Sequence, residues 1–280
     1  MDSSPQISVL QTAWQWWTNA AGYEGRLAAT RRLVGVLWEF MRDSTPERRK
    51  LRFGDAGYDW DYRVNTTSGA VGWRDRLLGM FHSEYQPTDP AAFREMLDGL
   101  QQTLAQSSNS DQGALNLNNF TFSDFTFVDL GSGKGRTLLM ASDYPFRRIL
   151  GVELIPALHQ IAQENVRLYK SESQKCFAIE TICADATKFS FPEKPLVVFL
   201  FNPFGESGMR RVIANLEQSL SARPRPVYVL YHNPLLEHTL SESGALRKIA
   251  GAQQYSLFSS SSFGSSSFGS LQPAEKSPSR

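Results

Sequence analysis

FVDLGSGKGR, residues 127–136, decides the fold of this chain. The run before it, residues 125–128, has the aromatic and β-branched composition of a buried parallel strand, which ends at Asp129. Three glycines follow, at Gly131, Gly133 and Gly135. Glycine permits positive φ and lets a ligand approach the bare backbone, and residues 136–143 then predict a helix whose first N–H groups face the same place. The stretch therefore predicts a strand, a glycine turn and a helix around a nucleotide-type ligand.

The spacing of these glycines separates the possible ligands. In the dinucleotide pattern G-x-G-x-x-G the third glycine comes one residue later than Gly135 does here. A phosphate-binding P-loop needs Ser or Thr directly after its lysine, whereas Lys134 is followed by glycine. The spacing thus disfavours both a pyrophosphate and a triphosphate. A glycine-rich turn without a ligand is the alternative that this stretch alone leaves open.

Composition limits the class of protein. The chain has 280 residues, 41% of them hydrophobic, enough for one α/β domain of ordinary size with extensions. A formal net charge of +1 gives no global basic field, so we expect neither duplex nucleic acid nor an anionic membrane as a partner. Two cysteines are too few for a disulfide framework or a structural zinc site. With no signal peptide and no run of about 18 apolar residues, we expect a soluble, cytoplasmic protein.

Strand-like and helix-like segments alternate after residue 120. Strands are expected at 125–129, 148–153, 179–183, 196–201 and 227–231, and helices at 136–143, 157–169 and 208–220. This alternation predicts an α/β fold, a Rossmann-like, doubly wound and mostly parallel sheet with an N-terminal helical extension. Ligands bind such sheets at the carboxyl ends of the strands.

The sequence divides into four parts. They are an N-terminal helical extension at 1–53, a lid or loop with a lead-in helix at 54–119, the core at 120–258 and a disordered Ser-rich tail at 259–280. Within the second part, residues 54–84 show no sustained period and are expected to form a structured loop or lid. The lead-in helix is expected at 91–106.

Three acids stand at three successive strand ends, at Asp129, Glu153 and Asp185. The two oxygens of Glu153 match a vicinal diol such as a ribose, and Asp185 can accept the amino hydrogens of an adenine. Nicotinamide enzymes bind ribose in the same way, and Asp185 could instead cap a turn. Together the three acids suit a ligand with an ammonium group, a ribose and an adenine, and with no phosphate.

Two further motifs follow the fourth and fifth expected strands. In Asn202-Pro203-Phe204, the amide can hydrogen-bond an acceptor nitrogen and Phe204 can form a flat apolar wall, or the run can be a purely structural turn. The run 231–234, Tyr-His-Asn-Pro, places a second aromatic and polar set on the same rim. Its histidine, His232, is a candidate general base, although a lone histidine is more often merely hydrogen-bonded.

Together these motifs resemble those of bacterial class I S-adenosylmethionine (SAM) dependent methyltransferases with an unassigned acceptor. The resemblance covers residues 55–240 and rests on Tyr85-x-Pro87-Thr88, Phe127 to Arg136, Gly151-Val-Glu153-Leu, Cys183-Ala-Asp185-Ala, Phe201-Asn-Pro-Phe-Gly205 and Tyr231-His-Asn-Pro234. The run Asn202-Pro203-Phe204 lacks one proline of the N-P-P-[FY] motif found in methyltransferases that act on amide or amino nitrogens. This departure leaves the acceptor open.

The resemblance implies SAM as cofactor, S-adenosylhomocysteine as product and no metal. It implies cofactor contacts from Tyr85, Thr88, Asp129, Gly131, Ser132, Gly133, Gly135, Arg136, Glu153, Asp185, Ala186 and Asn202. The expected catalytic residues are Asn202, which would orient the acceptor, together with Pro203, Phe204 and Tyr231, which would wall its pocket. Such an enzyme has mainly to align and desolvate the reactants.

We therefore expect a SAM-dependent methyltransferase whose acceptor is a protein side chain or a small molecule, with nitrogen favoured as the methylated atom. Nucleic acid fits the nearly neutral charge less well. One alternative is a non-catalytic SAM-binding or scaffold protein that uses its tryptophan-rich helices and Ser-rich tail for contacts. The other is an NAD(P)-dependent oxidoreductase on the same fold, which the glycine spacing disfavours.

Overall fold

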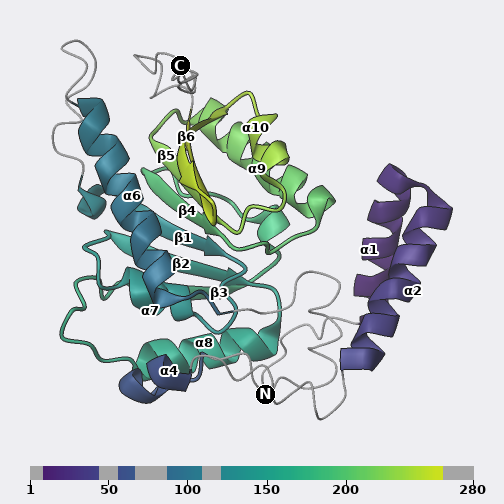
Figure 1. Cartoon of the computed structure of the whole chain (residues 1–280), viewed down its shortest axis with the longest axis horizontal. Helices are drawn as coiled ribbons and strands as arrows, with labels where there is room; N and C mark the ends of the chain where they lie inside the picture. The colour runs from purple at the N-terminus through teal and green to yellow at the C-terminus, as the bar shows by residue number, and fades with distance from the viewer. Residues whose placement is uncertain (1–8, 44–55, 67–86, 109–120, 261–280) are drawn as a thin grey trace, which may run out of the picture.

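The computed structural model describes residues 9–43, 56–66, 87–108 and 121–260. Within these residues the chain forms a seven-stranded sheet of order β3-β2-β1-β4-β5-β7-β6 (Figure 1). The strands are β1 (Thr126–Leu130), β2 (Arg148–Glu153), β3 (Ile179–Cys183), β4 (Leu196–Leu200), β5 (Val227–His232), β6 (Leu246–Ala252) and β7 (Tyr255–Ser260). The expected contact Tyr85 lies outside the described residues, as does the tail beyond Ser260.

Helices cover both faces of this sheet, and an N-terminal helical hairpin stands beside it (Figure 1). The α-helices are α1 (Val9–Glu24), α2 (Arg26–Asp43), α4 (Ala56–Tyr62), α6 (Pro90–Ser108), α7 (Arg136–Ala141), α8 (Pro156–Leu168), α9 (Glu206–Ala222) and α10 (Glu237–Ser241). Two 3₁₀ turns are η2 (Phe122–Asp124) and η3 (Ala186–Lys188). In the described part of the chain, no helix has the length and apolar character needed to cross a membrane.

The strand pairing confirms the predicted mostly parallel, doubly wound sheet. Strands β1 to β5 pair in parallel, whereas β7 is antiparallel to both β5 and β6. The chain moves outward from β1 to β2 and β3, then returns to place β4 on the other side of β1. The connections therefore reverse direction between β1 and β4, and in such sheets the crevice at this point is the usual ligand site.

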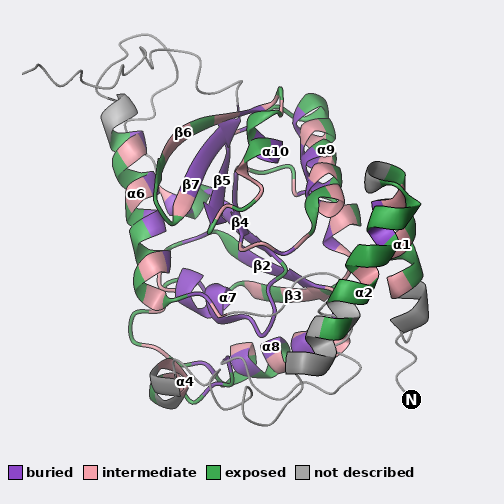
Figure 2. Ribbon diagram, turned by 45° about the vertical axis from the view of Figure 1, so that its right-hand side comes forward, coloured by how far each residue is buried: buried purple, intermediate pink, exposed green. Residues whose placement is uncertain are grey.

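Each central strand is buried on both faces, as Figure 2 shows. Successive side chains alternate between the faces, so Val128 packs in one core with α9 while Phe127 packs in another with α6 and α7. Because neither face meets water, these strands read as continuous apolar runs in the sequence. This is why their expected bounds agree with the structure to within a residue.

Two regions differ from the expectation. Residues 56–62, expected to lie in a loop or lid, form the helix α4, whose two turns are too short to show a period in the sequence. Strands β6 and β7 were not predicted, and β7 continues to Ser260, two residues beyond the expected end of the core at residue 258. Its serines resemble those of the low-complexity tail, yet Ser256, Ser259 and Ser260 are buried.

The hydroxyl of Ser260 generates a stability prediction. Ser260 Oγ accepts a hydrogen bond from Val227 N at 3.2 Å and donates one to Arg225 O at 3.1 Å, and the side chain is buried. We expect Ser260→Ala to lower the free energy of unfolding by about 1–2 kcal/mol in urea titrations, because two buried groups lose a partner. Ser259→Ala removes one long bond, of 3.4 Å, and is the control. Equal stability of the two variants would contradict the role of Ser260.

Candidate cofactor site

A cavity lies at the carboxyl ends of β1, β2 and β4, at the reversal point of the sheet. About 860 Å³ of space lies between its walls, part of it open to solvent. The cavity brings together most of the residues that the sequence singled out: Thr88, Asp129, Gly131, Ser132, Gly133, Arg136, Glu153, Asp185, Ala186, Pro203 and Phe204. Segments more than 110 residues apart in the chain thus meet at one place.

The glycine loop, residues 131–135, takes its shape from backbone hydrogen bonds. The N–H groups of Gly131 and Ser132 both donate to Val152 O, at 2.8 and 3.0 Å, and Gly135 N donates to Ser132 O at 2.8 Å. Gly131 has φ +86°, and a Cβ on it would lie 2.6 Å from Pro203 Cβ. Only glycine therefore fits at 131, where the loop meets the run that follows β4.

Glu153 connects the end of β2 to the glycine loop. Its Oε2 accepts from Gly133 N and its Oε1 from Ile155 N, both at 2.8 Å. Burial raises the pKa of Glu153, while the N–H groups that it accepts from lower it. A carboxylate has about four lone-pair sites, so both oxygens keep the capacity to accept hydrogens from a ligand in the cavity. Glu153 thus holds the loop and also lines the cavity.

Asp129 is the second buried acid of the cavity, with 3% of its surface exposed. Its carboxylate accepts a hydrogen bond from Thr137 Oγ1 of α7. Burial raises the pKa of Asp129 to about 7, Thr137 lowers it and the nearby Glu153 raises it further. A cationic group in the cavity would favour the ionised carboxylate and lower this pKa.

Ser132 supplies an independent sign that the cavity takes a polar ligand. Ser132 lines the cavity, and its buried Oγ has no hydrogen-bond partner among the described residues. A buried hydroxyl without a partner is uncommon in native proteins because desolvating it is costly. The residues present therefore fit a ligand that brings polar groups to the glycine loop.

Asp185 shows both of the roles weighed from the sequence. Its Oδ1 accepts from Thr187 N at 2.9 Å and from Thr187 Oγ1 at 2.7 Å, so it caps η3. It also lines the cavity next to the buried Ala186. Lys188 Nζ lies 4.0 Å from its Oδ2. Capping occupies one oxygen and leaves Oδ2 for a ligand.

The expected catalytic residues divide into two sets. Pro203 and Phe204 line the cavity, whereas Asn202 and Tyr231 are not part of its lining. Tyr231 OH donates to Asn202 Oδ1 at 2.8 Å, and Asn202 Nδ2 donates to the carbonyl of Asn233 at 2.7 Å. The Asn202 amide thus ties the end of β4 to the end of β5, with its own backbone at φ +44°. This resembles the structural turn weighed as an alternative.

Two other residues singled out from the sequence also lie off the cavity lining. Gly135 precedes α7 as its N-cap, with φ +82°. His232 packs against Phe201, with ring centroids 4.3 Å apart and the two rings tilted by 36°. Burial lowers the pKa of His232, while Asp89 raises it, so the imidazole is predominantly neutral near pH 7.

Several lining residues were not among the cofactor contacts or catalytic residues expected from the sequence, although some stand inside the quoted motifs. They are Pro87, Thr137, Val152, Leu154, Ile155, Leu158, Thr187, Phe199 and Phe201. Most adjoin a recognised motif, and Leu154 and Ile155 directly follow Glu153. Adjacency to a strand end was therefore the signal that could have found them.

The raised pKa of Asp129 predicts a pH dependence of stability. Its folded pKa, about 7, exceeds its ordinary 3.8, so the unfolded chain loses this proton first and stability falls as pH rises between the two values. We expect wild-type protein, without ligand, to lose up to about 4 kcal/mol relative to Asp129→Asn between about pH 4 and pH 8. The Asn variant still accepts the Thr137 bond. Urea titrations of both proteins across this pH range test the prediction. A difference in the free energy of unfolding between them that stays constant with pH would contradict it.

Comparison with protein-family models and with curated proteins found no match. Among solved structures, the chain is similar to the RNA methyltransferase from Salinibacter ruber in complex with S-adenosyl-L-homocysteine (19% identity, 62% of this chain and 91% of that chain, TM-score 0.38). It is also similar to the ribosomal protein L11 methylase from Lactobacillus delbrueckii subsp. bulgaricus (14%, 57% and 76%, TM-score 0.35). The described part of the chain itself shows a Rossmann-like, mostly parallel α/β sheet.

Proposed function

We propose that this chain is a SAM-dependent methyltransferase. The observation that carries the proposal is the convergence of Asp129, Glu153 and Asp185 on one cavity, around a glycine loop whose spacing suits neither pyrophosphate nor triphosphate. Three carboxylates would repel a phosphate-bearing ligand, whereas they favour one that offers an ammonium group and hydrogen-bond donors. SAM offers all of these.

Each of the three acids would contact a different part of the cofactor. Glu153 is the acceptor for the ribose hydroxyls, and Asp185 Oδ2 is the acceptor for the adenine amino group. Asp129 is the counter-charge for the ammonium group of the methionine end. Ser132 Oγ gains a partner when the cofactor binds, and Leu158 gives the cavity an apolar wall on the α8 side.

When bound, SAM supplies a methyl group on a positively charged sulfur, ready for transfer to a nucleophile. The chain contributes alignment and the exclusion of water. Phe199, Phe201 and Phe204, together with Pro203, form the apolar side of the cavity at the end of β4. A nucleophile held against this wall loses its hydration shell, and an amine would have to be neutral there.

Asn202 and Tyr231 do not line the cavity, but they support the apolar wall through hydrogen bonds. The Tyr231 hydroxyl accepts from Leu236 N at 3.2 Å and donates to Asn202, so two strand ends and the segment after β5 are joined at one oxygen. We assign to both residues the positioning of Pro203 and Phe204. Any direct contact between Asn202 and an acceptor would use the second lone pair or second hydrogen of its amide.

The acceptor that we favour is a nitrogen of a protein side chain or of a small molecule. The net charge of +1 supports this choice over duplex nucleic acid, which needs a basic surface. The rivals remain a scaffold that binds SAM without turnover and a nicotinamide oxidoreductase. Equilibrium binding distinguishes a nicotinamide oxidoreductase from the proposed methyltransferase, because an oxidoreductase would bind NADH and not S-adenosylhomocysteine.

A labelling experiment tests turnover. Purified protein is incubated with methyl-labelled SAM and cell extract fractionated by size, with Asp185→Asn as the parallel control. A methyltransferase is expected to give a labelled product that depends on wild-type protein, and its size class separates protein from small-molecule acceptors. A scaffold would bind SAM and label nothing in any fraction.

Asp185→Asn tests the adenine contact cleanly. The Asn Oδ1 can still cap Thr187, while the amide NH₂ in place of Oδ2 cannot accept from an amino group. We expect calorimetry to show S-adenosylhomocysteine binding weakened about tenfold to a hundredfold, because the adenine amino group loses its acceptor. Glu193→Gln, at an exposed carboxylate, is the matched control. Equal affinity of the two variants would overturn the assignment.

A further inference from the structure

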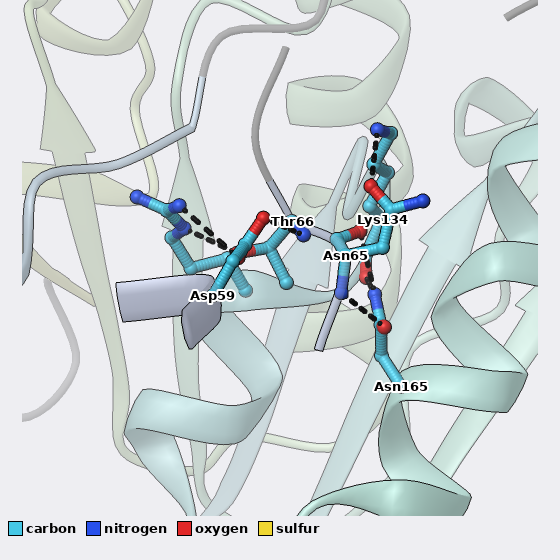
Figure 3. A network of polar contacts seen from close by, with 6 residues as sticks. Asp59, Asn65, Thr66, Lys134 and Asn165 are labelled. Atoms are coloured by element: carbon cyan, nitrogen blue, oxygen red, sulfur yellow. Dashed lines mark hydrogen bonds and ion pairs between the residues drawn. The ribbon is translucent and has the colours of Figure 1, made fainter. Parts of the chain in front are cut away.

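A short segment outside the recognised motifs is bonded to the glycine loop from the side away from the cavity. Helix α4 ends at Tyr62, and Arg63, with φ +53°, turns the chain so that the next residues lie against α7 and α8. There Val64 is buried in one cluster with Leu139 and Tyr169. We call residues 59–66 the brace, and Figure 3 shows its polar contacts.

Asn165 of α8 joins the brace to the glycine loop. Its Oδ1 accepts from Asn65 N at 2.8 Å, and its Nδ2 donates to Asn65 O and to Lys134 O, both at 2.9 Å (Figure 3). Lys134 is the middle residue of the loop's last Gly-x-Gly, so this bond fixes the peptide between Lys134 and Gly135. The Asn165 side chain is 2% exposed, and three backbone groups depend on it.

Two buried cations of the loop region also point to the brace. Lys134 Nζ donates to Asn65 Oδ1 at 3.0 Å, and burial lowers the pKa of this lysine while Asp59 raises it. Arg136 Nε donates to Thr66 Oγ1 at 2.7 Å, and its Nη2 lies 3.5 Å from Asp59 Oδ1. Asp59 in turn accepts from Thr66 N at 2.8 Å. Arg136 also lines the cavity, so the brace reaches the cavity wall through it.

These contacts complete the support of the loop. On the cavity side the loop is held by Glu153 at Gly133 and by Pro203 packed against Gly131. Its three glycines at positive φ give it a large conformational entropy to lose when its N–H groups take up a ligand. Bonds that fix the loop before the ligand arrives reduce this cost of binding.

We propose that the brace is part of the cofactor-binding machinery, and that Asn165 and Asn65 are positioning residues that hold the glycine loop ready for its ligand. This inference rests on the proposed function for the identity of the ligand, but not for the ordering of the loop. Both residues lie outside the loop and the acids, and neither lines the cavity.

The test compares Asn165→Ala and Asn65→Ala with wild-type protein. We expect the amides of Gly133 and Gly135 to exchange with deuterium about tenfold faster in ligand-free Asn165→Ala, while those of β5 keep their rates. Calorimetry is expected to show S-adenosylhomocysteine binding weakened at least about tenfold by Asn165→Ala, because the loop must order on binding. Asn65→Ala, which removes only the bond from Lys134, is expected to give a smaller shift of the same sign.

Arg225→Ala is the matched control. The Arg225 side chain is also buried and donates to backbone carbonyls of Lys194, Ser219 and Arg223, but near the amino ends of β4 and β5. We expect Arg225→Ala to lower the melting temperature without changing the exchange of the loop amides or the affinity for S-adenosylhomocysteine. If the effects of Asn165→Ala came only from a general loss of packing, Arg225→Ala would show the same effects. Unchanged affinity in both brace variants, even with faster exchange, would overturn the proposal.

The experiment distinguishes failure of the brace proposal from failure of the proposed function. If wild-type protein does not bind S-adenosylhomocysteine, the proposed function fails, and unchanged loop exchange in the variants would then overturn the brace on its own. If Asn165→Ala does not fold, Asn65→Ala decides, because Asn65 is exposed and its loss should not unfold the protein.

Discussion

The carboxylate of Glu153 is the contact on which the site depends. With one oxygen on Gly133 N and the other on Ile155 N, it joins the end of β2, the glycine loop and the start of α8. If Glu153 contacted only a ligand, another side chain with a hydrogen-bond acceptor could replace it. Glu153 sets the backbone that receives the ligand, so the shape and the chemistry of the cavity follow from the same two hydrogen bonds.

This arrangement places two buried acids side by side at the cavity. Asp129 and Glu153 are both buried, burial raises the pKa of both, and the nearby Glu153 raises the pKa of Asp129 further. The fold offsets part of the cost with Thr137 and with backbone N–H groups. What is left over is electrostatic strain stored at the cavity, together with the unsatisfied hydroxyl of Ser132. A ligand with a positive charge and hydrogen-bond donors relieves both, which is why such strain accompanies binding sites.

The sequence predicted what local patterns encode. Strands β1, β2, β4 and β5 are mainly apolar because they are buried on both faces, so the acids that follow such runs stand out in the sequence. Helix α4 was missed because its stability is tertiary, since Val64 and the bonds of Asp59 hold it in place. Strand β7 was missed because buried serines read as a polar tail. The side-chain directions of Lys134 and Asn202 could not be foreseen, because each is set by partners at least 29 residues away.

The glycine loop explains why distant segments had to be recruited. A loop that brings its backbone to a ligand through three glycines has few side chains with which to pack itself in place. Its order has to come from neighbours on each side, from Pro203 and Glu153 at the cavity and from Asn165 and the brace behind. The contacts of the brace therefore offset the flexibility that the glycines give the loop. A loop with more conformational freedom needs more fixed contacts from its neighbours to hold it in one conformation.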